Sequence, residues 1–185
     1  MFQKLTGSAR SVLRAAMERS EQAGAPGIRT EDLLLPLFDR PDIAAGAALA
    51  TLGLAERRAS VEQALADAAR RGGLSQTDAE ALAGIGIDLA EVLGQAERAH
   101  GEGALAVGDA TRDRWRPEYR AFSEGAKKVL ERALREAVEN GGKQIGDQHL
   151  LLALATPPGV VADVLAEHGA TSTEIRRALA RRPAA

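Results

Sequence analysis

The chain has 185 residues, of which 45% are hydrophobic and 27% charged, and its formal net charge is −2 at pH 7. This is the balance of an ordinary globular protein, and so small a net charge gives no bulk attraction to nucleic acid or to an anionic membrane. The absence of cysteine excludes disulfides, thiolate metal sites and thiol nucleophiles, and with only 3% aromatic residues the core has to be aliphatic, which favours packed helices over a sheet. The start MFQKLTGSARSVL lacks the apolar run of a signal peptide and no segment approaches a membrane span, so we expect a cytoplasmic protein.

Four helices are predicted in the first 72 residues. The first carries an apolar stripe at spacing i, i+3, i+4, i+7 and ends near Gly24; the stripe is Ala9, Val12, Leu13 and Ala16. The second is short and largely buried, lies in IRTEDLLLPLF (28–38), and has Thr30 as its expected N-cap. A third, in 43–53, ends at Gly53, and a fourth covers roughly 56–71.

Residues 73–121 have no counterpart elsewhere in the chain. Two short helices capped at Ser75 and Asp88 are predicted first, with a core stripe formed by Leu89, Val92, Leu93 and Ala96. The Gly-rich and then charged stretch 101–121 predicts an exposed connector, which Trp115 and Tyr119 would anchor to the surface. Acidic residues dilute its arginines (112, 114, 116 and 120), which indicates a solvated linker and not a nucleic-acid site.

The last third of the chain repeats the first. A shift of 117 residues places 5–37 on 122–154 without a gap, and ten of the 33 positions are identical. The identical pairs are Ala9/Ala126, Val12/Val129, Leu13/Leu130, Ala16/Ala133, Gly24/Gly141, Ile28/Ile145, Leu33/Leu150, Leu34/Leu151, Leu35/Leu152 and Leu37/Leu154. Because nearly all are apolar or glycine, what repeats is a packing pattern.

The same four helices are therefore expected again. Asp147 is the expected N-cap of the second, in IGDQHLLLALA, and the third lies in 159–169. The fourth covers 172–182 and begins with a capping box from Thr171 to Glu174. We predict an all-α fold with two four-helix repeats, 1–72 and 122–182, packed about a pseudo-two-fold axis as one globular domain, with 73–121 as a helical insert and connector.

The second repeat resembles a known family. FSEGAKKVLERALREAVENGGKQIGDQHLLLALATPPGVVADVLAEHGA (122–170) is similar to the second repeat of the Clp amino-terminal domain, and residues 1–70 resemble its first repeat less closely. In ClpC-, ClpA- and ClpB-type unfoldases this domain receives substrates. The insert in 73–121 is longer than the usual ClpC connector.

A catalytic role is not expected. The family's unfoldases continue into ATPase modules that need the phosphate loop G-x-x-x-x-G-K-[ST], which this sequence lacks. We therefore expect a free-standing Clp-N-like protein or the front part of a larger one. The three histidines have no zinc-protease spacing and there is no G-x-S-x-G elbow, so we predict no enzyme, no metal and no cofactor.

The resemblance implies a phosphoarginine-type site at the start of the second helix of each repeat. A helix N-terminus offers N–H groups to a phosphate, and a carboxylate can hold a guanidino group. The first repeat keeps Thr30 and Glu31 of the family motif, whereas the second has Asp147 and Gln148. Only the first site is therefore predicted to bind, and plain helix capping by Thr30 is the alternative.

The resemblance also implies a surface that binds adaptors and cyclic peptides where the two repeats begin. The matching positions are Phe2, Arg10, Leu13, Phe122, Lys127 and Glu131. Core packing explains the two phenylalanines equally well. The predicted function is a non-catalytic protein- or peptide-binding module that modulates a Clp unfoldase as a decoy, with protein partners and with no nucleic acid or membrane. The alternative is a helical regulator or scaffold with degenerate sites.

Overall fold

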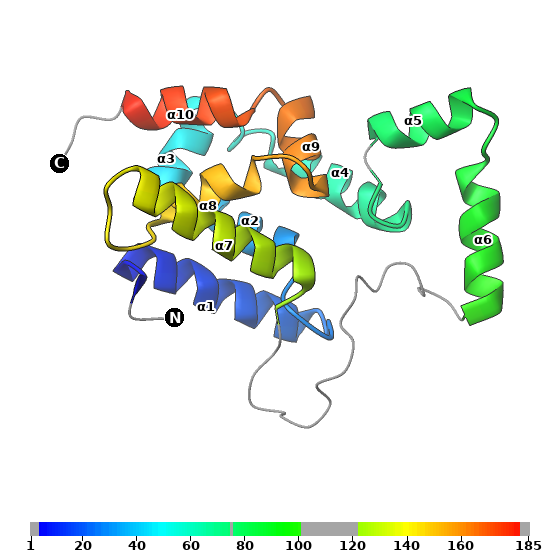
Figure 1. Cartoon of the computed structure of the whole chain (residues 1–185), viewed down its shortest axis with the longest axis horizontal. Helices are drawn as coiled ribbons and strands as arrows, with labels where there is room; N and C mark the ends of the chain where they lie inside the picture. The colour runs from blue at the N-terminus through cyan, green and yellow to red at the C-terminus, as the bar shows by residue number, and fades with distance from the viewer. Residues whose placement is uncertain (1–3, 75, 101–121, 182–185) are drawn as a thin grey trace.

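The computed structural model describes residues 4–74, 76–100 and 122–181, and over these residues the chain is all-α, as predicted (Figure 1). The helices are α1 (Gly7–Gln22), α2 (Thr30–Phe38), α3 (Ala44–Thr51), α4 (Arg58–Arg70), α5 (Gln76–Gly84), α6 (Leu89–His100), α7 (Glu124–Glu139), α8 (Asp147–Leu154), α9 (Val160–Glu167) and α10 (Ser172–Ala180). None of these helices has both the length and the apolarity needed to cross a membrane. The predictions for Ser75, Trp115, Tyr119 and the arginines of 112–120 lie outside the described residues.

The duplication is visible in how the repeats begin. Helices α1 and α7 start and end 117 positions apart. The hydroxyl of Thr6 accepts a hydrogen bond from the Ala9 amide at 3.2 Å, and the hydroxyl of Ser123 accepts one from the Ala126 amide at 3.1 Å. Both helices are therefore fixed at their first turn by the same cap. Each is followed by a glycine at positive φ, Gly24 at 62° and Gly141 at 70°, a conformation that a residue with a Cβ avoids.

The predicted caps of α2 and α8 were wrong by one residue. Arg29 and Gly146 occupy the N-cap positions, and Thr30 and Asp147 begin the helices. The capping acceptor lies at the third helical residue in both cases. Asp32 Oδ2 accepts from the Arg29 amide at 2.9 Å, and in the second repeat His149 Nδ1 accepts from the Gly146 amide at 3.0 Å. This reaching back from the third position is one half of a capping box, and it leaves the side chains at 30 and 147 available for other contacts.

Two isolated parallel bridges join the repeats reciprocally. Leu5, at the start of the first repeat, pairs with Ile145 of the second, and Phe122 pairs with Ile28 of the first. The Thr6 amide donates to the Ile145 carbonyl at 3.0 Å, and the Ser123 amide donates to the Ile28 carbonyl at 2.9 Å. The two pairings are equivalent under the 117-residue shift, so they are consistent with the predicted pseudo-two-fold relation.

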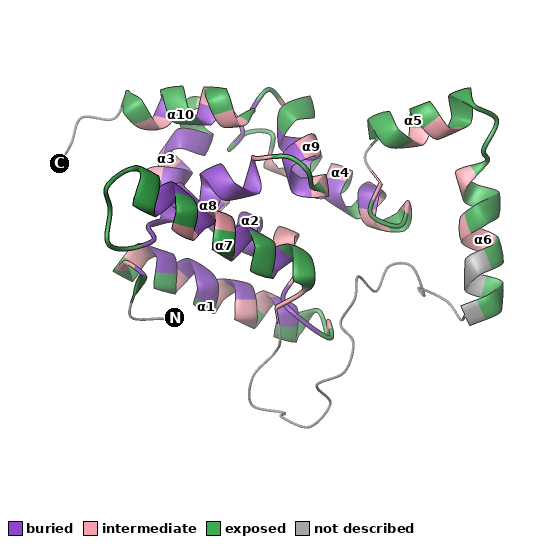
Figure 2. Ribbon diagram, viewed as in Figure 1, coloured by how far each residue is buried: buried purple, intermediate pink, exposed green. Residues whose placement is uncertain are grey.

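The helices of the two repeats interleave around a leucine core. Helix α3 packs against α10 and its counterpart α9 packs against α4, while α2 and α8 contact each other. Figure 2 shows α2 and α8 as the most buried elements, and every residue of α8 except Gln148 is buried. The largest fully buried side chains are Val12, Ile28, Leu33, Leu34, Leu37, Leu49, Leu54, Ile145, Leu150, Leu151, Leu165 and Ile175.

The predicted core stripe of the insert is a second error. Asp88 caps α6 as expected, since its Oδ1 accepts from the Ala90 and Glu91 amides at 2.9 and 3.2 Å. However, Val92 is 48% exposed, and Leu89 and Leu93 are only half-buried. Helices α5 and α6 stand away from the two repeats (Figure 1), and Leu89 and Leu93 only line a hollow shared with α5 and the end of α4. The side chain of Ala96 lies outside the description.

Candidate functional site

The start of α2 brings together both residues predicted for the first ligand site. Thr30 and Glu31 are half-buried, and the Thr30 hydroxyl donates to Glu31 Oε2 at 3.3 Å. The other carboxylate oxygen of Glu31 lies 3.0 Å from Nη1 of Arg29. The first turn of a helix leaves N–H groups without intrahelical acceptors, which suits an anion. Arg29 adds a positive charge there, but it also occupies the carboxylate that a ligand's guanidino group would need.

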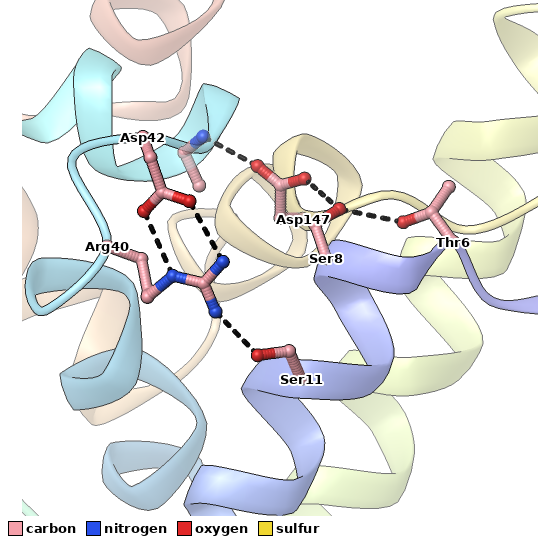
Figure 3. Close-up of polar contacts among 7 residues, drawn as sticks. Thr6, Ser8, Ser11, Arg40, Asp42 and Asp147 are labelled. Atoms are coloured by element: carbon pink, nitrogen blue, oxygen red, sulfur yellow. Dashed lines mark hydrogen bonds and ion pairs between the residues drawn. The ribbon is translucent and has the colours of Figure 1, made fainter.

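The start of α8 is arranged differently, because Asp147 turns into the protein (Figure 3). Asp147 is 4% exposed. Its Oδ1 accepts from the Ser8 hydroxyl at 2.6 Å, and its Oδ2 accepts from the Ala45 amide at 2.8 Å. The Ser8 hydroxyl lies 2.9 Å from that of Thr6, the cap of α1. Asp147 thus ties α8 to the starts of α1 and α3, and its carboxylate does not face a ligand at the surface.

A second polar contact lies beside this one. Arg40, in the turn between α2 and α3, forms two hydrogen bonds of 2.9 Å with the carboxylate of Asp42. Its Nη1 donates to the Ser11 hydroxyl on α1 at 2.5 Å (Figure 3). Hydrogen bonding to Asp42 raises the pKa of Arg40, and the negative charge of Asp147 acts in the same direction. The turn before α3 is therefore held on α1 by a permanently charged group.

A hollow of about 670 Å³ lies next to the start of α8. It is lined by Asn140, Gly142, Lys143, Gln144, Gln148 and His149. The Gln148 carboxamide folds back over Gly146, where an added Cβ would meet its Oε1 at 2.3 Å. The neutral side chain of Gln148 therefore lies against the backbone at the start of α8.

His149 is a structural residue at the edge of this hollow. It is 7% exposed, and burial lowers its pKa although the charges of Glu136 and Asp147 act to raise it. The unprotonated Nδ1 accepts the capping bond from Gly146. A protonated ring would present a donor to that N–H group, so the cap requires the neutral imidazole.

The residues predicted for the adaptor surface differ in their exposure. Arg10, Lys127 and Glu131 are exposed, and Phe122 is half-buried against the core. Arg10 and Lys127 occupy equivalent positions of the two repeats, and Lys127 Nζ lies 2.6 Å from Glu124 Oε1.

Two other residues were predicted for this surface, Leu13 and Phe2. Leu13 is 3% exposed, because it continues the stripe with which α1 packs on the core, and so it offers no surface to a partner. Phe2 lies outside the described residues.

Sequence reasoning missed the Ser8–Asp147–Ala45 contact. Ser8 and Asp147 are 139 residues apart, and no local pattern indicates that they meet. Among residues 4–74, 76–100 and 122–181, no group of three His, Asp or Glu side chains is placed to hold a metal ion.

Comparison with known proteins identifies relatives for both parts of the duplication. Residues 121–182 match the family described as the Clp repeat (R) N-terminal domain. The chain is similar to the chloroplast ATP-dependent Clp protease ATP-binding subunit ClpA homolog of Brassica napus and to the chloroplast chaperone protein ClpC1 of Arabidopsis thaliana. Each is 29% identical over 182 residues, which are 98% of this chain but 16% and 15% of the relatives. The chain thus spans about a sixth of the length of these relatives. Both relatives are chloroplast proteins, and the cytoplasmic location of this chain stays a prediction.

Replacing Asp147 is expected to weaken the junction between the repeats. Asp147→Ala leaves the buried Ala45 amide without its acceptor, and it also removes a charged partner of Ser8. We expect the free energy of unfolding to fall by about 2–4 kcal/mol, measured by urea denaturation. Asp147→Asn keeps one acceptor oxygen and should lose less. The matched control is Glu167→Ala at an exposed position of α9, for which a change within about 0.5 kcal/mol is expected. Equal losses in both alanine variants would contradict the assignment.

The stability of the fold should depend on pH through His149. Its pKa is lowered in the folded protein, so the unfolded chain takes up the proton more readily. The contribution of the neutral ring is fully present above the unfolded pKa of about 6.5 and is lost as the pH falls below it. Urea denaturation between about pH 5 and pH 8 measures this. His149→Asn retains an acceptor without a titrating ring and should flatten the profile; an unchanged profile would show that His149 is not responsible.

Proposed function

We propose that this chain, which carries a Clp repeat N-terminal domain and is homologous along its length to ClpC- and ClpA-type proteins, is a non-catalytic module that binds proteins or peptides. The observation that carries the proposal is the family match over 121–182. That segment is about a third of the chain, and it supplies Phe122, Lys127 and Glu131 of the expected adaptor surface. Such a module acts as a decoy for, or a modulator of, a Clp protease system by competing for its substrates or adaptors.

The geometry of the described residues supports one principal binding surface. Arg10 and Lys127 project from equivalent positions of α1 and α7, and Glu131 lies one turn after Lys127 on α7. Phe122 offers a half-buried aromatic ring at the start of the second repeat. Aromatic residues are enriched at protein interfaces, whose rims are polar and solvent-accessible. Apolar cyclic peptides and adaptor segments are the proposed ligands.

A helical regulator or scaffold with degenerate ligand sites is the second candidate. Two contacts favour it: the carboxylate of Glu31 is already paired with Arg29, and Asp147 is buried against Ser8 and Ala45. Neither helix start then offers the free carboxylate that a phosphoarginine site requires. Binding experiments on the two surfaces separate these candidates.

The first experiment tests the aromatic anchor. Burial of a phenylalanine side chain contributes about 1.5–3 kcal/mol, so Phe122→Ala should weaken the binding of an apolar cyclic peptide roughly tenfold or more, as measured by calorimetry. The matched control is Val138→Ala, at a 65% exposed apolar position of the same repeat, which should leave the affinity unchanged. Circular dichroism establishes that both variants are folded. Unchanged affinity in folded Phe122→Ala would remove Phe122 from the surface.

The second experiment tests the helix starts with a phosphoarginine peptide. We expect at most one site per chain, abolished by Glu31→Ala and unaffected by Gln148→Ala. Arg29 pairs with the carboxylate of Glu31, so Arg29→Gln should change the affinity for the phosphoarginine peptide. The sign of the change distinguishes two roles of Arg29. Tighter binding means that Arg29 blocks the guanidino position, and weaker binding means that Arg29 contacts the phosphate. Two equal sites would contradict the prediction that only the start of α2 binds the peptide. No binding at all would favour the scaffold.

A further inference from the structure

Ser60 is an exposed serine in the first turn of α4, where it ends the sequence RRAS (57–60). It is the only serine or threonine of the chain with arginines both two and three residues before it. Arginines at these two positions form a charge pattern that serine kinases with acidic substrate grooves select, because the carboxylates of the groove pair with the guanidinium groups. The Ser60 hydroxyl is therefore placed, in the sequence and at the surface, as an acceptor of a phosphoryl group.

The two arginines before Ser60 lie where a kinase can reach them. Arg57 is exposed, and its guanidinium donates to two main-chain carbonyls of the preceding turn at 3.0 and 3.1 Å. Arg58 pairs with Asp39 and, at 2.8 Å, with Glu62. The side chains of these two acids are 50% and 41% exposed. Ion pairs at such exposed positions are weak, so the carboxylates of a kinase can replace them.

The start of α4 is held weakly by its own main chain. Arg57 occupies the N-cap position without a capping hydrogen bond from its side chain, and the first turn contains no acidic residue. The first helical hydrogen bond joins the Val61 amide to the Arg57 carbonyl at 3.1 Å, and Val61 is fully buried. Helix ends of this kind fray. An enzyme can therefore extend the chain up to Ser60 while the rest of α4 stays packed.

The Ser60 hydroxyl also contacts the second repeat. It lies 2.9 Å from Nε2 of His168, the residue at which α9 ends. Nδ1 of His168 lies 2.8 Å from the Val164 carbonyl. Because a carbonyl only accepts, Nδ1 carries a hydrogen, and Nε2 of the neutral ring accepts from Ser60. Helices α4 and α9 pack side by side (Figure 1), so a group attached to Ser60 lies at the contact between the two repeats.

We propose that Ser60 is the phosphorylation site of an arginine-directed serine kinase, and that the phosphate strengthens the contact between α4 and α9. Ser60 Oγ attacks the γ-phosphorus of a nucleoside triphosphate and the bond to the β-phosphate oxygen breaks. The nucleoside diphosphate leaves, and the hydroxyl proton passes to the catalytic carboxylate of the kinase.

The product suits the place where it forms. A phosphoserine carries about −1.5 to −2 charges, and the first turn of a helix offers N–H groups without intrahelical acceptors and the positive end of the helix dipole. The phosphorylated Oγ has no hydrogen to donate to His168. A protonated His168 then donates from Nε2 to a phosphate oxygen, and this ion pair takes the place of a single neutral hydrogen bond.

The site is tested by incubating the full chain with ATP and the catalytic subunit of an arginine-directed serine kinase, followed by peptide mass spectrometry. We expect one phosphate per chain, on Ser60, and none in Ser60→Ala. Arg57→Gln should lower kcat/KM for the phosphorylation at least about tenfold, because it removes charge-assisted hydrogen bonds to the kinase. The matched control is Arg70→Gln, at an exposed arginine that ends α4, which should leave kcat/KM unchanged.

Ser123 provides an internal comparison, since it also has an arginine three residues before it, but its hydroxyl caps α7. Phosphate on Ser123 in place of Ser60, or no phosphate on the folded chain, would overturn the assignment.

The contact between the helices is tested by urea denaturation at about pH 6, where an ordinary histidine is largely protonated. The phosphorylated chain should unfold at a higher urea concentration than the unmodified chain. His168→Gln removes the titrating ring and should reduce this gain, whereas Lys128→Gln, which removes an exposed charge of α7, should preserve it. A midpoint that falls or stays the same on phosphorylation would overturn the proposed link between α4 and α9. Neither failure would affect the binding function proposed above.

Discussion

Leu5 pairs with Ile145 and Phe122 pairs with Ile28, so each repeat begins by adding its first residues to a loop of the other. Both loops lead directly into the leucine helices at the centre, α2 and α8. The isoleucines are 0% and 2% exposed. Because the pairing is backbone to backbone, it fixes the direction in which α1 and α7 leave the junction. Helices α3 and α10, and α4 and α9, also pack against one another across the two repeats.

The two repeats have kept one backbone plan while their side chains at equivalent positions have diverged. Ser8 in the first repeat is equivalent to Gly125 in the second. Ser8 donates to Asp147, whereas a Cβ added at Gly125 would lie 3.3 Å from Cγ2 of Thr30. The contact between the repeats is thus a hydrogen bond at Ser8, whereas at Gly125 the backbone lies close to the methyl group of Thr30. The caps diverge in the same way, since a carboxylate serves in one repeat and a neutral imidazole in the other.

The sequence predicted the helices well where the information was local. Residues only a few positions apart encode the apolar stripes of α1 and α7 and the glycines that end these helices. Thr30 and Asp147 were assigned as N-caps because their residue types favour that position. The actual acceptors, Asp32 and His149, sit three residues beyond the cap. A histidine is not a residue type that signals capping, which explains the error at Asp147.

The remaining misjudgements concern where a face of a helix ends up in three dimensions. The stripe Leu89–Val92–Leu93 on α6 has the same spacing as the buried stripes. Periodicity shows that a face is apolar, but it does not show whether this chain or another covers it. Leu13 was assigned to a surface by its place in a family motif, yet α1 turns it into the core. Asp147 meets Ser8 across 139 residues of sequence, a separation that no local pattern encodes.

The reciprocal bridges also determine when the protein can fold as it is synthesised. Ile28 pairs with Phe122 and Leu5 pairs with Ile145, so the first repeat cannot form these two pairings until residues 122 and 145 have been synthesised. Pairings between residues this distant form slowly because a long loop has to close first. During that interval the leucines of α2 lack the cover that α8 provides. The nascent first repeat therefore exposes apolar side chains that the folded chain buries, and such exposure favours aggregation.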